Sequence, residues 1–271
     1  MKKLIVFGDS FANYDWQPSL HEKTWGASLG KLLELPVINY GVSGSALTLS
    51  LNKFVEYYQS DNYSPDDIIV FVLTDISRLW VESMEETRCF GNIAHHIGNS
   101  DSLDMQGKKW FKKNGEGALW TVLNVYDTKI NYELIKILSF LQIWAAANLN
   151  NTLVVLRAFP NEDRSKEAVA IEKLNELVTP SNNFFPIING MALGYIVAHE
   201  FKEFKGWGDG PDIRVNHMSP VNREILSQML YDVISYRDIS KYNFSLFKKH
   251  LYYDTVPGYT FTKDPPASDY I

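Results

Sequence analysis

Short apolar runs alternate with longer amphipathic segments along most of the chain. The runs Leu4–Phe7, Val37–Asn39, Ile68–Leu73 and Thr152–Leu156 are rich in aliphatic and β-branched residues, and Phe185–Ile188 adds a weaker fifth run. Runs of this length and composition are typical of strands. Because Ile68–Leu73 is apolar at every position, we expect it to be buried on both faces, as in a parallel sheet.

The segments between these runs have helical spacing. We expect helices over residues 24–33, 47–58, 130–147 and 166–178, and a last one that starts at Ser219-Pro220 and places Val221, Ile225, Met229 and Val233 on one face. Ser is a preferred N-cap residue, and Pro is tolerated at the first helical position. Strands that alternate with helices predict an α/β fold, a three-layer α/β/α sandwich around a mostly parallel central sheet of about five strands.

Two regions depart from this pattern. Between about 82 and 128, glycines interrupt the chain and Trp110, Phe111 and Trp120 are interleaved with them. This indicates an aromatic-rich insertion. From 236 to 271 the chain is rich in Tyr and Phe, which indicates an extension that either lies on its own domain or docks a partner. We therefore expect one domain over 1–235 with an insertion at about 82–128, followed by the 236–271 extension.

Composition excludes several classes of protein. The 271 residues carry a formal net charge of −6 and contain no Lys/Arg-rich run, so we expect no nucleic-acid partner. Cys89 is the only cysteine, which excludes an intrachain disulfide and a zinc knuckle. The apolar run near the N-terminus is too short for a signal peptide, and no segment has the length of a membrane span. A cytoplasmic or virion-associated setting is therefore favoured over classical secretion, and the oligomeric state stays open.

The first candidate for chemistry is Ser10. The strand Leu4–Phe7 runs directly into Gly8-Asp9-Ser10. In open α/β sheets reactive groups lie beyond the carboxyl ends of strands, where a Ser hydroxyl and its own backbone N–H can face the same cleft. The alternative is a tight turn in which Ser10 caps a helix.

The second candidate is His217, which lies just before the capped helix that starts at Ser219-Pro220. A histidine has a near-neutral pKa, so it can take a proton from a serine and return it to a leaving group. The other five histidines have no comparable setting, and we expect them to be structural.

Together these segments resemble the SGNH/GDSL hydrolase family, whose members carry a Gly-Asp-Ser block near the N-terminus and an acid-and-His block before a C-terminal helix. The segment Asn39–Ser45 is similar to the family's second block, whose Gly backbone N–H contributes to the oxyanion hole. The resemblance implies a flavodoxin-like SGNH fold with Ser10 as nucleophile and His217 as general base. It also implies oxyanion donors at Ser10 and Gly44, with Gly41 as a turn residue; a plain Gly-rich turn is the alternative for this block.

The third block departs from the family pattern. Where the family has an oxyanion-binding Asn, the chain has Thr74-Asp75-Ile76-Ser77-Arg78. If Asp75 occupies that place, its carboxylate must be protonated, turned away or neutralised, for example by Arg78. Thr74, Ser77 or Arg78 could instead donate to the oxyanion, and a strand end with a solvated charge pair is the alternative. Asp9, Thr74 and Arg78 are further candidates for contacts with the substrate or for charge pairing.

The fourth block also departs from the pattern, because Arg214 stands where the family has its acid. Asp212 is the nearest acid and the expected third member of the triad, with Asp209 behind it. There it would orient the imidazole and stabilise the imidazolium. A Ser-His dyad oriented by a backbone carbonyl is the alternative.

The resemblance implies a serine hydrolase acting on small acyl esters, including O-acetyl groups on carbohydrate, through an acyl-enzyme. The sequence lacks metal-ligand spacings, a P-loop and a dinucleotide fingerprint, so we expect neither a metal nor another cofactor. A non-catalytic binding or assembly protein of the same fold is the rival interpretation. Thioesterase or peptidase activity stays open as a third.

Overall fold

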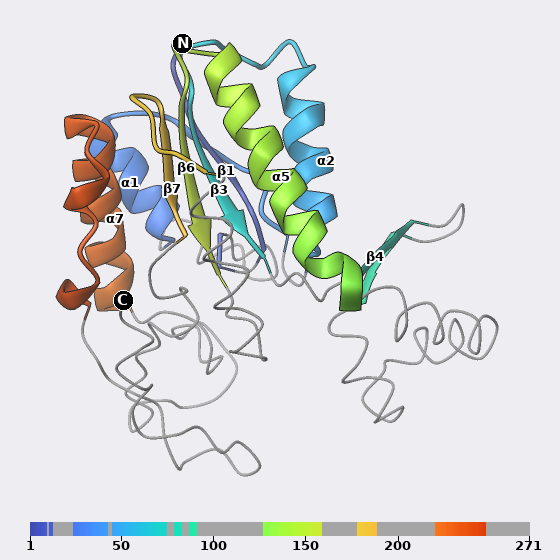
Figure 1. Cartoon of the computed structure of the whole chain (residues 1–271). Helices are drawn as coiled ribbons and strands as arrows, with labels where there is room; N and C mark the ends of the chain where they lie inside the picture. Colours follow the sequence, from blue (N-terminus) through green and yellow to red (C-terminus); the bar gives the residue numbers. More distant parts are fainter. Residues whose placement is uncertain are drawn as a thin grey trace, which may run out of the picture.

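The computed structural model describes residues 1–9, 11–12, 24–42, 45–74, 79–82, 87–90, 127–158, 178–188 and 220–247. Within them the elements are β1 (Leu4–Phe7), α1 (Trp25–Leu33), β2 (Val37–Asn39), α2 (Leu47–Tyr58), β3 (Ile68–Leu73), β4 (Leu79–Glu82), β5 (Thr87–Phe90), α5 (Asp127–Ala147), β6 (Thr152–Arg157), β7 (Phe184–Ile187), α7 (Pro220–Tyr236) and the short 3-10 helices η6 (Ile239–Lys241) and η7 (Phe244–Leu246). Figure 1 shows their arrangement.

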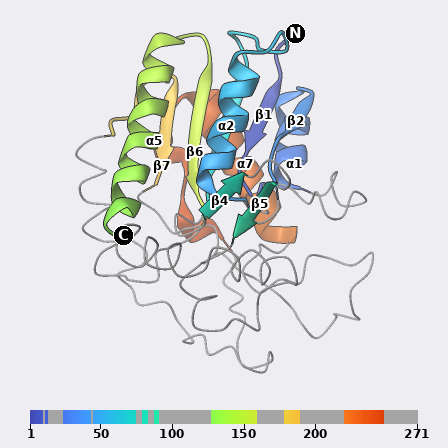
Figure 2. The same ribbon diagram turned by 90° about the vertical axis from the view of Figure 1, so that its right-hand side faces the viewer.

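Five strands form one parallel sheet in the order β2-β1-β3-β6-β7. Helices α1 and α7 cover one face of it, and α2 and α5 cover the other (Figures 1 and 2). The structure therefore confirms the predicted α/β/α sandwich with a parallel five-stranded centre.

Strand alternation divides the core into two layers. Leu4, Val6, Val70 and Val72 pack toward α1 and α7, whereas their neighbours along the strands pack toward α2 and α5. All six residues of β3 are buried, which confirms the expectation of a central strand covered on both faces. Each side of the sheet thus has its own apolar core.

The helix α1 shows how local sequence sets an element's ends. The hydroxyl of Thr24 caps its first turn by accepting a hydrogen bond of 3.1 Å from the Ala27 N–H. The helix ends where Glu34 takes a left-handed backbone with φ of 55°. At Gly30 an added Cβ would lie 2.1 Å from Val37 Cγ2, so a glycine lets α1 lie close to β2.

A network of polar side chains joins the amino edge of the sheet. The buried Asp67 carboxylate accepts hydrogen bonds from the backbone N–H groups of Lys3 and Ser64, at 2.7 and 3.0 Å, and from the Tyr57 hydroxyl. Asn151 donates to the Asp67 carbonyl at 3.1 Å. Burial, and next the hydrogen bond to Asp67, raise the pKa of Tyr57 above its ordinary value. The network satisfies polar groups that would otherwise be buried without partners.

Some element bounds differ from the sequence predictions. An antiparallel hairpin, β4–β5, occupies a stretch for which the pattern indicated no regular structure and overlaps the start of the expected insertion. Helix α5 begins at Asp127, three residues before the apolar stripe, and β7 begins one residue early. Most of the helix expected over 166–178 lies outside the described residues; Val178 itself is not helical.

The chain after α7 packs back onto the domain as far as the structure describes it. Arg237 has φ of 53°, and the Asp238 carboxylate then caps η6 by accepting from the Ser240 N–H at 2.9 Å. Tyr242 and Phe247 contact the core beside α7, and burial raises the pKa of Tyr242. The expected division into a domain, an insertion at 82–128 and an extension from 236 stays a prediction, because much of those two segments lies outside the described residues.

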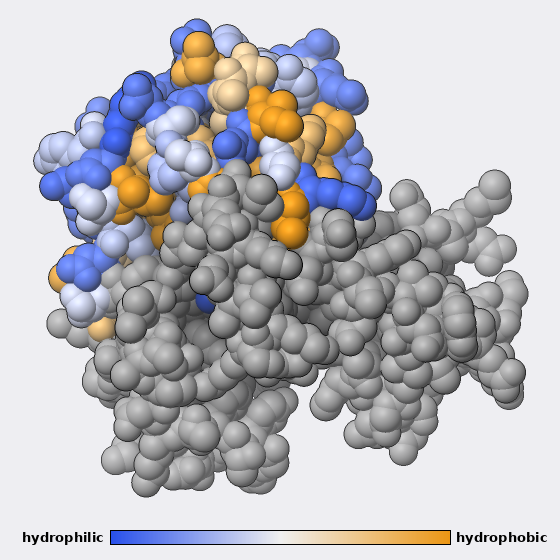
Figure 3. Space-filling view, in the orientation of Figure 1, coloured by the Kyte–Doolittle hydropathy of each residue, from blue (hydrophilic) through white to orange (hydrophobic). Residues whose placement is uncertain are grey.

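The described surface mixes apolar and polar side chains. Figure 3 shows apolar residues interspersed with hydrophilic ones on one face of the molecule. Phe140 and Ile143 of α5 are among the large apolar side chains that are exposed. None of the helices in the described part of the chain combines the length and the apolar character needed to cross a membrane.

Candidate active site

The strand order reverses between β1 and β3. From β1 the chain passes through α1 to β2, and from β3 it passes on to α5 and β6, so the two connections leave on opposite sides of the sheet and cover opposite faces. Ligands in open α/β proteins bind where the strand order reverses in this way. Figure 1 shows the carboxyl ends of the strands meeting at one edge, and Gly8, Asp9 and Thr74 follow β1 and β3 there.

The turn after β1 requires a glycine. Gly8 has φ of 149°, which side-chain-bearing residues rarely adopt, and an added Cβ would lie 2.7 Å from Val72 Cβ and 3.0 Å from Ala12 Cβ. Its carbonyl accepts hydrogen bonds from the Val42 N–H at 3.0 Å and from the Ser45 hydroxyl at 3.2 Å. The chain leaving β1 is therefore tied to the chain leaving β2.

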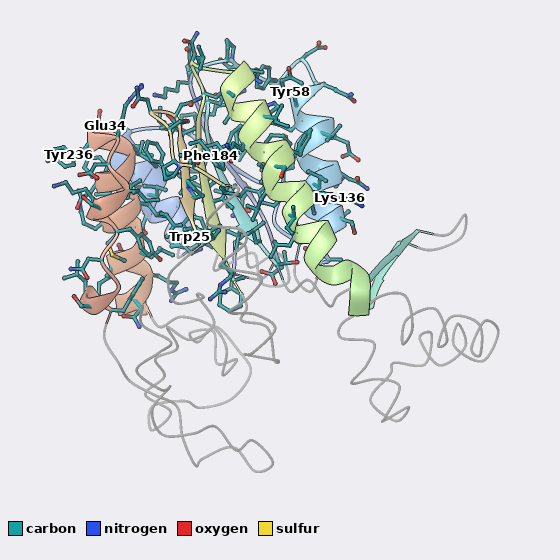
Figure 4. The ribbon with its side chains drawn as sticks, viewed as in Figure 1. Trp25, Glu34, Tyr58, Lys136, Phe184 and Tyr236 are labelled. Atoms are coloured by element: carbon teal, nitrogen blue, oxygen red, sulfur yellow. The ribbon has the colours of Figure 1, made fainter. Side chains whose placement is uncertain are left out.

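The residues on both sides of Ser10 in the chain are fixed by further hydrogen bonds. Asp9 is fully buried, and its carboxylate accepts from the Phe11 N–H at 3.0 Å while its carbonyl accepts from the Ala12 N–H at 2.9 Å. The Trp25 indole, at the start of α1 (Figure 4), donates to the Phe11 carbonyl at 2.6 Å. These bonds give Asp9 a positioning role. A contact between Asp9 and a substrate stays a prediction.

Asn39, at the end of β2, joins this turn to the next one. Its side-chain N–H donates to the Ala12 carbonyl at 2.7 Å, and its side-chain oxygen accepts from the Gly41 N–H at 2.9 Å. We call residues 8, 9, 11 and 12 the β1 turn, and Trp25, Asn39 and Ser45 its clamp. Sequence reasoning did not assign the clamp residues. An Asn whose side chain can accept from the backbone N–H two residues on is a known turn signal, but it does not reveal the partner 27 residues away.

The helix α7 is fixed against α1 near the same edge. The Ser227 hydroxyl is buried and lies 2.9 Å from the Trp25 carbonyl. Helix α7 begins at Pro220, as the sequence predicted. His217 precedes that start by three residues but lies outside the described part of the chain.

Thr74, directly after β3, is the one proposed oxyanion donor of the third block that the structure describes. It is 3% exposed, and its Oγ1 has no hydrogen-bond partner. The Leu73 carbonyl just before it accepts from the Ala158 N–H at 2.8 Å, which fixes the strand end. Thr74 therefore presents a buried hydroxyl with unused donor capacity at this edge.

The remaining sequence-predicted site residues lie outside the described residues; they are Ser10, Gly44, Asp75, Ser77, Arg78, Asp209, Asp212 and His217. Their roles stay predictions. The described residues contain no group of three or more His, Cys, Asp or Glu side chains that could hold a metal ion.

No family model and no curated protein sequence matches the chain. Solved structures do resemble it. One from Desulfitobacterium hafniense DCB-2, provisionally named a lipolytic protein of the G-D-S-L family, is 11% identical with a TM-score of 0.38, covering 86% of this chain and 99% of that one. A provisionally named SGNH hydrolase from Slackia heliotrinireducens is 12% identical with a TM-score of 0.41, covering 85% and 97%.

A third similar structure is an acetyl xylan esterase from the rumen bacterium Butyrivibrio proteoclasticus, 13% identical with a TM-score of 0.41, covering 87% of this chain and 64% of that one. The names of these three solved proteins agree with the hydrolase family that the sequence motifs resemble. Because the identities are this low and the TM-scores lie below 0.5, the proposed function rests on the chain's own residues and not on these similarities.

Proposed function

We propose that the chain is a serine ester hydrolase of the SGNH type that acts on small acyl esters. The observation that carries the proposal is the β1 turn. It lies at the carboxyl edge of the sheet, at the point where the strand order reverses. Phe11 and Ala12, which follow Ser10, accept hydrogen bonds from Trp25 of α1 and Asn39 of β2. Asp9, which precedes Ser10, accepts from the backbone N–H groups of Phe11 and Ala12. A nucleophile needs this kind of fixed support to be positioned for attack.

The proposed reaction proceeds through an acyl-enzyme. The Ser10 oxygen bonds to the ester carbonyl carbon while its proton passes to the His217 imidazole, and the backbone N–H groups of Ser10 and Gly44 hold the resulting oxyanion. The C–O bond then breaks, and the alcohol leaves with the proton from His217. A water molecule gives a proton to His217 and attacks the acyl carbon, which releases the acid and returns the proton to Ser10.

The third member of the triad and the substrate class rest on the family resemblance. Asp212 is the proposed acid that orients His217, with Asp209 as the alternative. O-acetyl groups on carbohydrate are the proposed natural esters.

The test is hydrolysis of p-nitrophenyl acetate and butyrate by the purified chain, with a fluorophosphonate label in parallel. Ser10→Ala and His217→Ala should each lower kcat by at least about 10³-fold, because members of a catalytic triad act as a unit. Ser245→Ala, which changes an exposed serine on η7, and His250→Ala are matched controls that should retain activity. Release of acetate from acetylated xylan then tests the carbohydrate substrate.

Turnover by the wild type, together with label recovered on the peptide that contains Ser10, would support the proposal. A folded wild type that neither hydrolyses these esters nor takes the label would contradict it. The non-catalytic binding protein would then be the better interpretation.

A further inference from the structure

The buried hydroxyl of Thr74 lacks a partner in a place where polar groups are otherwise well paired. Its Oγ1 has no hydrogen bond, although Gly8, Asp9 and Asn39 at the same edge all take part in hydrogen bonds. Buried polar atoms in native proteins are nearly always paired, so an unpaired one calls for an explanation, of which a catalytic role is one. A valine of almost the same shape would avoid the cost of burying the hydroxyl.

The register of the sheet relates Thr74 to the β1 turn. β1 and β3 are paired in parallel as far as Phe7 and Phe71, and Gly8 lies close to Val72 just past the end of β1. Thr74 directly follows β3, so it lies at the same carboxyl edge of the sheet as the β1 turn, which flanks Ser10 in the chain. By strand alternation Thr74 shares the face of Val72, which packs toward α1 and α7. This is also the side of the helix that follows His217 in the chain.

We propose that the Thr74 hydroxyl is the side-chain oxyanion donor of this enzyme, in place of the Asn that the resembled family carries; the inference rests on the proposed serine hydrolase function. The Thr74 O–H donates a hydrogen bond to the carbonyl oxygen of the ester as that oxygen gains negative charge. The proton stays on Thr74, and no bond is made or broken at this residue. A hydroxyl can do this, whereas the carboxylate of Asp75 would repel the oxyanion.

A donor that acts on the oxyanion changes the rate of the chemical step rather than the binding of the ester. Its loss should therefore lower kcat and leave KM nearly unchanged. A merely structural hydroxyl, or one paired with a fixed water, would instead affect thermal stability and leave kcat unchanged.

The test compares Thr74→Val with Thr74→Ser in the full chain, using p-nitrophenyl acetate turnover, fluorophosphonate labelling rate and thermal denaturation. Thr152→Val is the matched control, because it makes the same change at a buried position of β6 on the opposite edge of the sheet. We expect Thr74→Val to lower kcat by about 10²-fold at unchanged KM, a loss of the size found for single oxyanion donors. Thr74→Ser should recover most of the activity, and Thr152→Val should retain it.

The outcomes separate the two proposals. If the wild type hydrolyses the ester and Thr74→Val is equally active, the proposed role of Thr74 is wrong and the hydrolase function is still supported. A Thr74→Val variant whose lost activity follows only from a lowered melting temperature, with no recovery in Thr74→Ser, would also overturn that role. A wild type without turnover or labelling would overturn the hydrolase function and the role of Thr74 with it.

Discussion

Replacing Gly8 with alanine should destabilise the protein strongly. An alanine at φ of 149° carries backbone strain of about 1–3 kcal/mol. Its Cβ would also lie 2.7 Å from Val72 Cβ and 3.0 Å from Ala12 Cβ, and such overpacking costs about 1–3 kcal/mol more. The sum, about 4 kcal/mol, is a large part of the ~5–15 kcal/mol that stabilises a typical domain.

Chemical and thermal denaturation of Gly8→Ala measure this effect. A loss of about 4 kcal/mol corresponds to a melting temperature about 10 °C lower in a domain of this size. Gly26→Ala is the matched control, because Gly26 lies in α1 and its added Cβ would be in ordinary contact, 3.4 Å from Val6 Cγ2. The control should change stability by no more than about 1 kcal/mol.

The turn's geometry predicts a second effect of Gly8→Ala. The Gly8 carbonyl accepts from Val42 and Ser45, so a shift of the backbone at Gly8 also shifts the turn after β2. Ester hydrolysis at a temperature where the variant is still folded should therefore be slower than in Gly26→Ala. Equal stability of Gly8→Ala and Gly26→Ala would refute the reasoning from φ and from the Val72 contact.

Two further predictions concern stability alone. Glu34→Gly should stabilise the protein by about 1 kcal/mol, because φ of 55° strains any side-chain-bearing residue at the end of α1; unchanged denaturant unfolding would contradict this. Tyr57→Phe should cost about 1.5–3 kcal/mol at pH 7 through the lost hydrogen bond to the Asp67 carboxylate. Because the pKa of Tyr57 is raised in the folded state, its contribution is complete below the unfolded pKa of about 10 and is lost as the pH rises further; the difference in unfolding free energy between wild type and Tyr57→Phe should thus be equal at about pH 7 and pH 9 and smaller at about pH 11.

The central fold could be predicted from the sequence because its signals are local. The apolar runs that became β1 and β3 are buried at every position, and α7 begins at Pro220 as expected. Strands that are apolar at every position are typical of a parallel sheet covered on both faces. The hairpin β4–β5 was missed because the segment around Leu79–Phe90 mixes polar and apolar residues without a clear period.

The candidate site could be predicted only in part, because its support comes from residues distant in the sequence. Gly8 and Asp9 were visible as a motif, but the bond from Trp25 to Phe11 and the bond from Asn39 to Ala12 depend on how helix α1 and strand β2 fold back on β1. The unpaired hydroxyl of Thr74 is likewise a property of packing. Composition and spacing contain no signal for such pairings.

The polar networks at the carboxyl and amino edges of the sheet involve different parts of the chain. The hydrogen bonds described above for the β1 turn and its clamp join residues between 8 and 45, whereas the network around Asp67 joins the start of the chain to Tyr57 and Asn151 at the opposite edge. Distant sites of this kind contribute nearly additively to stability. Substitutions around Asp67 can therefore change the stability of the sandwich while the β1 turn and its clamp stay intact, so the two edges of the sheet can evolve separately.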